Sequence, residues 1–212
     1  MKSAKIWVAL GLLGMGAASA QADDINGWYA GAGVGQSRSN FNNPGIAAGV
    51  GSAATAISSS SNDTAYKLFG GYKFNRNFAV EGGYFDLGRF GFAATTVPAG
   101  TLNGNIKLKG VNLDAVGILP ITENFSAFGR VGVNYAEARD SFSGTGAVNV
   151  LNSNPSKREA NLKFGGGLQY DFTQSLGMRV EAERYRINDA VGSKGDIDLV
   201  SVGLVYRFPA KR

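Results

Sequence analysis

The chain has 212 residues, a formal net charge of +5, 31 glycines and neither cysteine nor histidine. Without histidine or cysteine it lacks the usual nitrogen and sulfur ligands of transition metals, and it lacks the imidazole base on which many hydrolases depend. The positive charge is too small and too dispersed to indicate nucleic-acid binding. We therefore expect a protein that is not an enzyme, carries no cofactor and binds no nucleic acid.

The N-terminus has the order of a secretory signal peptide. Lys2 and Lys5 precede an apolar run over residues 6–18, and small residues follow it. Cleavage is predicted after Ala20 or after Ala22. The alternative, a retained anchor helix, fits less well because the run is short and rich in glycine.

The chain is therefore divided into a signal peptide, residues 1–22, and one domain, residues 23–212. In this domain, segments of roughly ten residues alternate between apolar side chains and charged, polar or glycine positions. Successive side chains of a strand point to opposite faces, so each segment has one apolar face and one polar face. A tilted strand of about this length crosses a bilayer. The segments are 27–35, two within 64–88, then 105–119, 124–138, 160–172, 176–187 and 197–208.

The connections between these segments alternate between long and short. Long loops are predicted at 39–63, 87–103, 139–159 and 188–196, and short turns at 75–76, 120–123 and 173–175. Bacterial barrels show this asymmetry, with short periplasmic turns and long extracellular loops, and no strand edge can stay unpaired in lipid. The sequence predicts an all-β fold: an eight-stranded antiparallel up-and-down transmembrane β-barrel in the bacterial outer membrane, preceded by a cleaved signal peptide.

Aromatic residues test this register, because they gather near both ends of the outward faces. Such residues sit at membrane–water interfaces in spanning barrels. The predicted interface girdle consists of Trp28, Tyr72, Phe74, Phe78, Tyr84, Phe125, Tyr135, Tyr170, Phe172, Tyr206 and Phe208.

The inward faces carry four basic and four acidic residues. The interior of an eight-stranded barrel is only wide enough for side chains to fill it, so these groups are predicted to pair and to plug the lumen. They are Lys67, Glu81, Asp114, Arg130, Lys163, Arg179, Glu181 and Glu183.

Three functions are weighed against this pattern. The first is a structural surface barrel whose loops contact the environment or a host ligand. The second is a narrow pore of low conductance for small ions or solutes. The third, a soluble lipocalin-like binder, would need the apolar face inside and the charges outside, which is the reverse of the predicted register.

Basic residues also gather near the long-loop ends of the strands. Cations at the outer rim attract the phosphates of lipopolysaccharide, which with outer-membrane lipid is an expected partner; an ordinary solvated rim is the alternative. The residues are Lys107, Lys109, Arg184 and Arg186.

Four segments resemble the eight-stranded transmembrane domain of the OmpA family of outer-membrane proteins. They are GGYKFNRNFAVEGGYFDLG (70–88), LPITENFSAFGRVGVNYA (119–136), GGGLQYDFTQSLGMRVEAERY (165–185) and DLVSVGLVYRF (198–208). Members of this family often carry a periplasmic peptidoglycan-binding domain after the barrel. Since the sequence stops at Arg212, we expect the barrel domain only.

The resemblance also assigns roles to individual residues. Glu81 and Arg179 match positions that form an internal salt bridge in the family, whereas a second luminal pair of the family falls on Val116 and Gln169 and is absent here.

The final strand resembles the C-terminal signal read by the barrel-assembly machinery, although four residues follow its terminal aromatic. This resemblance implies the machinery as a partner during biogenesis. The matching residues are Phe208, Tyr206, Leu204 and Val202.

Overall fold

The computed structural model describes residues 26–40, 53–97, 100–146, 156–188 and 194–209. The predicted signal peptide lies outside these residues and stays a prediction. No helix in the described ranges is long and apolar enough to cross a bilayer. The strands are β1 (Gly27–Asn40), β2 (Ala53–Ser60), β3 (Asn62–Lys73), β4 (Phe78–Val97), β5 (Gly100–Pro120), β6 (Phe125–Gly146), β7 (Ser156–Asp171), β8 (Leu176–Asn188) and β9 (Lys194–Arg207).

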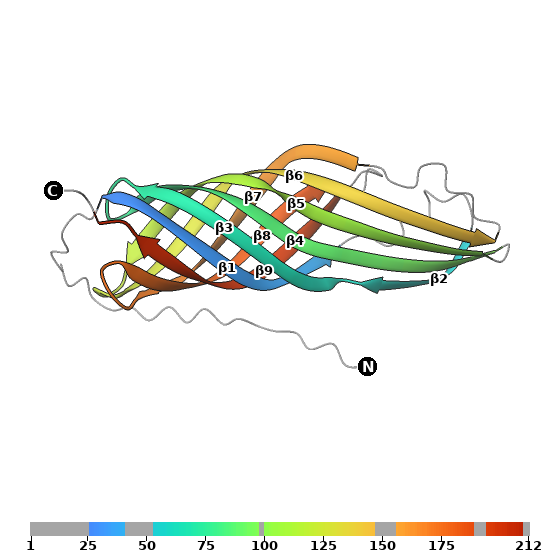
Figure 1. Ribbon diagram of the computed structural model, residues 1–212, viewed down its shortest axis with the longest axis horizontal. Coiled ribbons are helices and arrows are strands. Elements are labelled where there is room, and N and C mark those ends of the chain that lie inside the picture. Colours follow the sequence, from blue (N-terminus) through green and yellow to red (C-terminus); the bar gives the residue numbers. More distant parts are fainter. Residues whose placement is uncertain (1–25, 41–52, 98–99, 147–155, 189–193, 210–212) are drawn as a thin grey trace.

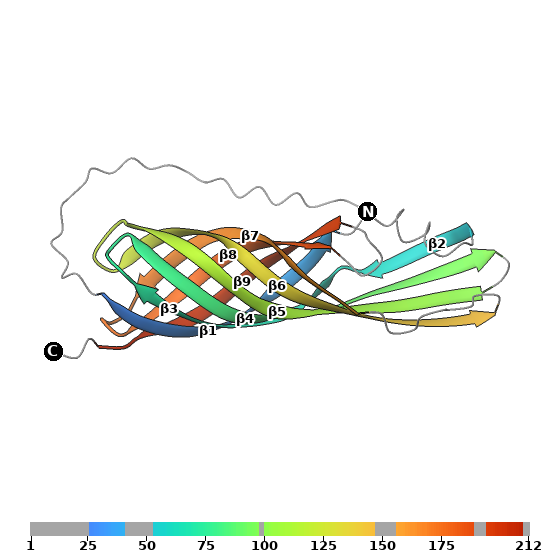
Figure 2. The same ribbon diagram turned by 90° about the horizontal axis from the view of Figure 1, so that it is seen from above.

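Eight of these strands form a closed barrel, and β2 is an addition to it (Figures 1 and 2). Each barrel strand pairs with the next in sequence, always antiparallel, and the last strand returns to the first. Closure is seen at Ala30 of β1, which pairs with Gly70 of β3 on one side and with Tyr206 of β9 on the other. The predicted eight-stranded up-and-down barrel is therefore confirmed.

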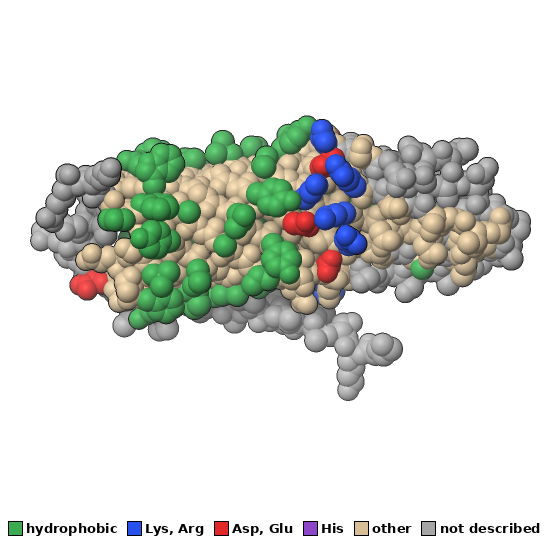
Figure 3. Space-filling model, viewed as in Figure 1, with side chains coloured by type: hydrophobic (Ala, Val, Ile, Leu, Met, Phe, Trp, Pro, Cys, Tyr) green, Lys and Arg blue, Asp and Glu red, His purple; other side chains and the backbone are tan. Residues whose placement is uncertain are grey.

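The outer wall of the barrel carries apolar side chains, whereas its interior contains both apolar and charged side chains. Neighbouring residues of β1 show the alternation: Trp28 is 65% exposed and Tyr29 only 5%. On the face drawn in Figure 3, apolar side chains form a band over one part of the molecule. The eleven predicted girdle aromatics all point to this outer surface, where edge-to-face pairs join Trp28 to Tyr72 and Tyr206 to Phe208 at centroid distances of 5.1 and 5.3 Å.

The strands are longer than predicted on the side of the long connections. β4, β5 and β6 continue past the apolar band and, together with β2, make a protruding sheet (Figures 1 and 2). Over the described residues, the predicted loops 39–63, 87–103, 139–159 and 188–196 are thus wrong in extent; their segments 41–52, 98–99, 147–155 and 189–193 lie outside the described residues. Outside the bilayer neither face of a strand must suit lipid, so the apolar alternation that predicts a strand disappears although the backbone pairing continues.

A β-bulge in β4 marks where the barrel passes into the protruding sheet. The pairing of β4 with β5 shifts between Asp86 and Gly88, and Gly88 has a φ of 86°, a conformation that favours glycine. Two side chains, one from β3 and one from β1, hold the bulge. The Asp63 carboxylate accepts a hydrogen bond from the backbone N–H of Arg89 at 2.5 Å, and the Ser37 hydroxyl donates to the Leu87 carbonyl at 2.6 Å.

The interior of the barrel is built in three layers. An outer apolar cluster lies toward the protruding sheet, and an inner apolar cluster lies toward the short turns, with charged residues between them. The outer apolar cluster contains Ala65, Phe85, Leu87, Phe90, Ile106, Leu108, Ala136, Ala138, Tyr185, Ile197 and Leu199. The inner apolar cluster contains Tyr29, Phe69, Ala79, Val116, Phe128 and Val205.

Candidate functional site

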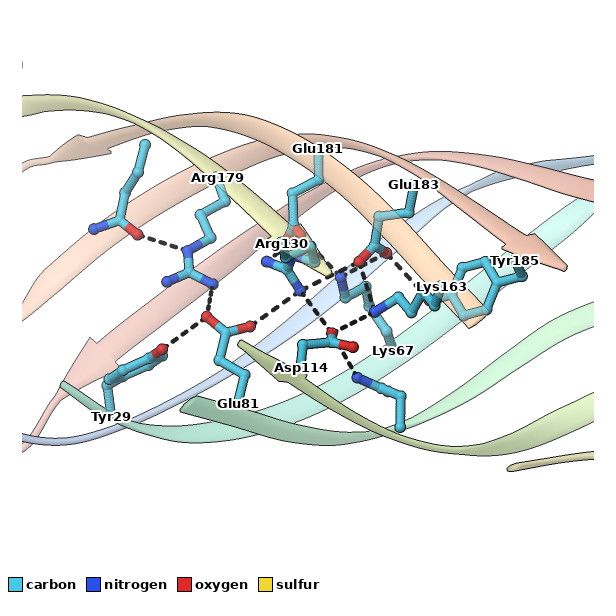
Figure 4. A network of polar contacts seen from close by, with 12 residues as sticks. Tyr29, Lys67, Glu81, Asp114, Arg130, Lys163, Arg179, Glu181, Glu183 and Tyr185 are labelled. Carbon is cyan, nitrogen blue, oxygen red and sulfur yellow. Dashed lines mark hydrogen bonds and ion pairs between the residues drawn. The ribbon is translucent and has the colours of Figure 1, made fainter. Parts of the chain in front are cut away.

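The middle layer of the lumen is the candidate site, and it is called the charged layer below. It consists of the eight ionisable residues predicted to face inward, none of which is more than 5% exposed. Six strands supply them, from β3 to β8, so the contacts of the layer link strands on different sides of the lumen (Figure 4). Its members are Lys67, Glu81, Asp114, Arg130, Lys163, Arg179, Glu181 and Glu183.

Arg130 is the centre of the charged layer. Its Nη1 atom lies 3.0 Å from Glu81 Oε2, 3.2 Å from Glu183 Oε1 and 3.7 Å from Asp114 Oδ2. Its Nη2 atom lies 2.7 Å from Glu181 Oε2. One guanidinium group thus reaches all four carboxylates, which come from β4, β5 and β8.

Two lysines complete the neutralisation of the carboxylates. Lys67 Nζ lies 2.9 Å from Glu181 and 2.8 Å from Glu183. Lys163 Nζ lies 2.7 Å from Asp114 and 2.8 Å from Glu183. Every carboxylate of the layer therefore has two or more cations within ion-pair distance, which offsets the desolvation that burial imposes on both signs.

Glu81 and Arg179, the pair suggested by the family resemblance, lie together in the structure. Arg179 Nη1 is 2.6 Å from Glu81 Oε1, across the barrel from β8 to β4. Tyr29 donates a hydrogen bond to the same carboxylate oxygen at 2.8 Å, and Arg179 Nε donates to Gln169 Oε1 at 2.6 Å. Val116, at the other position of the absent second pair, packs in the inner apolar cluster.

Aromatic rings bound the charged layer on both sides, and their part in it was not predicted. The Arg179 guanidinium lies over Phe128 and Phe69, at 4.9 and 5.1 Å from the ring centres. On the other side, Lys163 Nζ lies 5.0 Å from the centre of Tyr185. The inward phase of the alternation identifies these rings as luminal, but nothing in the sequence places them against a particular cation.

The charged layer offers no unpaired nucleophile or base. Glu181 and Glu183, which are two residues apart on one face like a carboxylate pair, are both bound by Lys67. In the part of the chain that the structure describes, no three acidic residues are placed to hold a metal ion. The chemistry that this arrangement supports is mutual neutralisation of buried charges.

A second set of charges lies on the outside, where the apolar band ends (Figure 3). We call it the outer belt, and the strand register brings its residues together: Asp86, Arg89, Lys107, Lys109, Glu137, Arg139, Arg158, Arg184, Arg186, Asp196 and Asp198. Arg184 makes two hydrogen bonds to Asp198, at 2.6 and 2.8 Å. Lys107 lies 3.5 Å from Asp86. Within the described ranges, Lys109 and Arg186 have no carboxylate within ion-pair distance.

Glu137 of the outer belt is bound by two arginines. Arg139 and Arg158 donate hydrogen bonds to its Oε1 atom at 3.0 and 3.1 Å. Because both bonds favour the charged form, they hold the pKa of the Glu137 carboxyl below its ordinary value.

The residues of the predicted assembly signal lie on the outer wall, three of them in β9 and Phe208 directly after it. Val202, Leu204, Tyr206 and Phe208 are all exposed on the outer wall. The backbone N–H of Phe208 donates to the Trp28 carbonyl at 3.0 Å, so the signal residues also lie at the seam that closes the barrel.

Comparison with known proteins places this geometry in a family. The model of the OmpA-like transmembrane domain matches residues 22–212. Outer membrane protein A of Salmonella typhi is 30% identical in an alignment that covers 98% of this chain and 56% of the relative. Outer membrane protein A of Escherichia coli O157:H7 is also 30% identical, and 55% of its length is covered. The chain therefore spans about half the length of these relatives.

Solved structures share the fold. Neisserial surface protein A matches with a TM-score of 0.57 and 12% identity, covering 85% of this chain and 97% of that structure. Ail, the attachment invasion locus protein of Yersinia pestis, matches with a TM-score of 0.52 and 19% identity, covering 87% of this chain and all of that structure. The chain thus belongs to the OmpA-like transmembrane domain family and is a protein of the bacterial outer membrane.

Proposed function

We propose that the protein is a non-enzymatic surface barrel, in which a plugged lumen stabilises the wall and the protruding strands contact the environment. The observation that carries this proposal is the filling of the lumen. Four cations and four carboxylates pair across the axis, and apolar clusters lie on both sides of them.

A narrow pore fits the same observation less well. An ion that passed through would have to part the contacts of Arg130 with its carboxylates, and it would also have to cross two apolar clusters without compensating polar groups. Breaking Glu81 from Arg179 alone would leave Glu81 held by Arg130, so this pair is not a sufficient gate.

The protruding sheet supports a role in surface contact. Ser141, Ser143 and Thr145 of β6 are exposed on it, as are Thr101 and others on the neighbouring strand. Such side chains offer hydrogen-bonding groups without exposing large apolar area, which suits a surface in water that binds a host or surface ligand.

The outer belt supports contact with lipopolysaccharide. Lys109 and Arg186 pair in register with Asp86 and Asp196 in a belt where basic groups outnumber acidic ones, and cations there attract the phosphates of outer-leaflet lipid. The predicted assembly signal, from Val202 to Phe208, is proposed to serve recognition by the barrel-assembly machinery before the seam with β1 closes.

Conductance recording across planar bilayers tests the plugged lumen. We expect the purified parent protein to give no steady ion-sized openings. Steady openings in the parent, with a conductance that changes in Glu81→Gln or Arg179→Met, would overturn the proposal in favour of the pore.

Cysteine labelling on intact cells tests the surface role, because the sequence has no cysteine of its own. Ser143→Cys lies on the protruding sheet, and Gln174→Cys lies in a short turn at the opposite end; both native side chains are exposed. A membrane-impermeant maleimide should label Ser143→Cys on intact cells, and Gln174→Cys only after the outer membrane is permeabilised. The reverse pattern would contradict the proposed orientation.

A further inference from the structure

A groove lies on the outer wall of the barrel where β1, β3 and β4 run side by side. Its volume is about 430 Å³. Gly70 and Gly82 form its floor as a directly opposed pair on adjacent strands, and Ala30 pairs with Gly70 on the far side. The lining residues are Trp28, Gly70, Gly71, Tyr72, Phe74, Val80 and Gly82.

The glycines of the floor are not explained by the packing inside the barrel. A Cβ atom built on Gly70 would come no closer than 3.7 Å to another atom, and the same distance holds for Gly82. These are ordinary contacts, so larger residues would fit the wall. The outward positions on either side carry large side chains such as Leu68, Tyr84 and Leu113. The two glycines therefore recess the outer surface across two adjacent strands.

The wall of the groove on the short-turn side is a fixed aromatic row. Trp28 meets Tyr72 edge to face at a centroid distance of 5.1 Å, and Tyr72 meets Phe74 in the same manner at 5.2 Å. Edge-to-face pairs of this kind are favourable beyond their buried area, so they keep the wall in place when the groove is filled.

The surroundings of the groove determine what fills it. It opens onto the apolar outer band, and a protein of the outer membrane has hydrocarbon there. Water gains little in such a space because it finds few polar partners. The groove lies at the short-turn end of the strands, which is the periplasmic side in bacterial barrels, so the inner leaflet of phospholipid faces it.

From these observations we propose that the groove is a binding site for one acyl chain of an inner-leaflet phospholipid, held against the backbone of β3 and β4 beside Trp28. The site differs from the rest of the lipid-facing wall, because here the acyl chain lies below the level of the surrounding protein side chains. It is independent of the function proposed above, since neither the lumen nor the protruding sheet takes part.

Tryptophan fluorescence provides the test, because Trp28 is one of the wall residues. The sequence has two tryptophans, Trp7 and Trp28, so the full chain with Trp7→Phe leaves a single reporter. The protein is reconstituted in phosphatidylcholine vesicles with a rising fraction of lipid brominated on its acyl chains. We expect Gly82→Leu, which fills the groove, to reduce the quenching of Trp28 at each fraction of brominated lipid.

Gly129→Leu is the matched control. Gly129 also faces outward, pairs with Gly117 and Gly166 on its neighbours, and would place a Cβ atom 4.0 Å from the nearest atom. It should leave the quenching of Trp28 at the parent level. Gly70→Leu fills the same groove from its other side and replaces Gly82→Leu if that variant does not give the heat-dependent gel shift of a folded barrel.

Two results would overturn the proposal. One is equal quenching in the parent, in the groove variants and in Gly129→Leu, which would mean that Trp28 meets only the general lipid annulus. The other is quenching in the parent that rises as the protein is diluted in lipid, which would mean that a second copy of the barrel covers the groove.

Discussion

Nη1 of Arg130 lies 3.0 Å from Oε2 of Glu81, although these residues come from β6 and β4 with β5 between them. The same guanidinium reaches the other three buried carboxylates, so Arg130→Met should leave the layer with four acids and three cations. Loss of one partner from a buried ion pair costs about 3–5 kcal/mol. We expect at least this loss in the free energy of unfolding, measured by urea titration of the folded barrel in detergent.

Arg179→Met is the comparison for that measurement. Arg179 has Glu81 as its one carboxylate partner at ion-pair distance among the described residues, and Arg130 remains beside Glu81 when Arg179 is removed. Arg179→Met should therefore lower the free energy of unfolding by less than Arg130→Met does. An equal or larger loss would show that Arg130 is not the centre of the layer.

Exchanging the charges of Glu81 and Arg179 should restore only part of the stability that each single reversal removes. The exchanged pair regains its mutual attraction, but the new arginine at position 81 then lies beside Arg130. Coupling between contacting residues amounts to about 0.5–3 kcal/mol. A double-mutant cycle of Glu81→Arg and Arg179→Glu measures this coupling energy. A coupling energy of zero would contradict the salt bridge between the two residues.

Two glycines of β6 provide a contrast between the inside and the outside of the wall. A Cβ atom on Gly132 would meet Asp114 Cα at 2.7 Å, whereas the nearest atom to a Cβ on Gly129 would be 4.0 Å away. Gly132→Ala should lower the free energy of unfolding by about 1–3 kcal/mol through overpacking. Gly129→Ala should raise it by about 0.4–1 kcal/mol, because alanine restricts the unfolded chain. Equal effects in the urea titration would contradict the assigned faces.

The pH dependence of stability should contain a contribution from Glu137. Its carboxyl has a pKa below the ordinary 4.5, since Arg139 and Arg158 bind the charged form. Between that ordinary value and the folded value the unfolded state binds more protons, so stability falls as the pH is lowered. The parent should exceed Glu137→Gln in urea midpoint above about pH 4.5, and the difference should vanish as the pH falls through the folded pKa. A difference in urea midpoint that grows as the pH is lowered would contradict the lowered pKa of Glu137.

The alternation of side chains was enough to predict the wall of the barrel from the sequence. Lys67 and Glu81 lie in the lumen, and Trp28 and Tyr206 lie on the outer wall, as a period of two requires. Lipid makes this possible, because an outward charge in the apolar band is costly and the contrast between the faces is correspondingly strong.

Three features could not be predicted in that way. Which carboxylates Arg130 meets depends on strand tilt and stagger, which periodicity along one strand does not contain. The outer apolar cluster was missed because residues such as Phe85 lie between outward aromatic and polar neighbours, where alternation by polarity fails. The protruding strands, with Ser143 and Thr101 exposed, extend beyond the apolar band, where neither face needs a composition that suits lipid.

The three-layer interior has a consequence for assembly. Counted by hairpin, the buried ionised groups cancel: β3 and β4 bring one of each sign, β5 and β6 one of each, and β7 and β8 two of each. Yet most of the close contacts join different hairpins, such as Lys67 with Glu181 and Arg179 with Glu81. Each hairpin thus carries no net luminal charge of its own. The contacts that join β3 and β4 to β8 form only when these strands are brought together across the lumen, so barrel closure adds these ion pairs to the backbone pairing of the last seam.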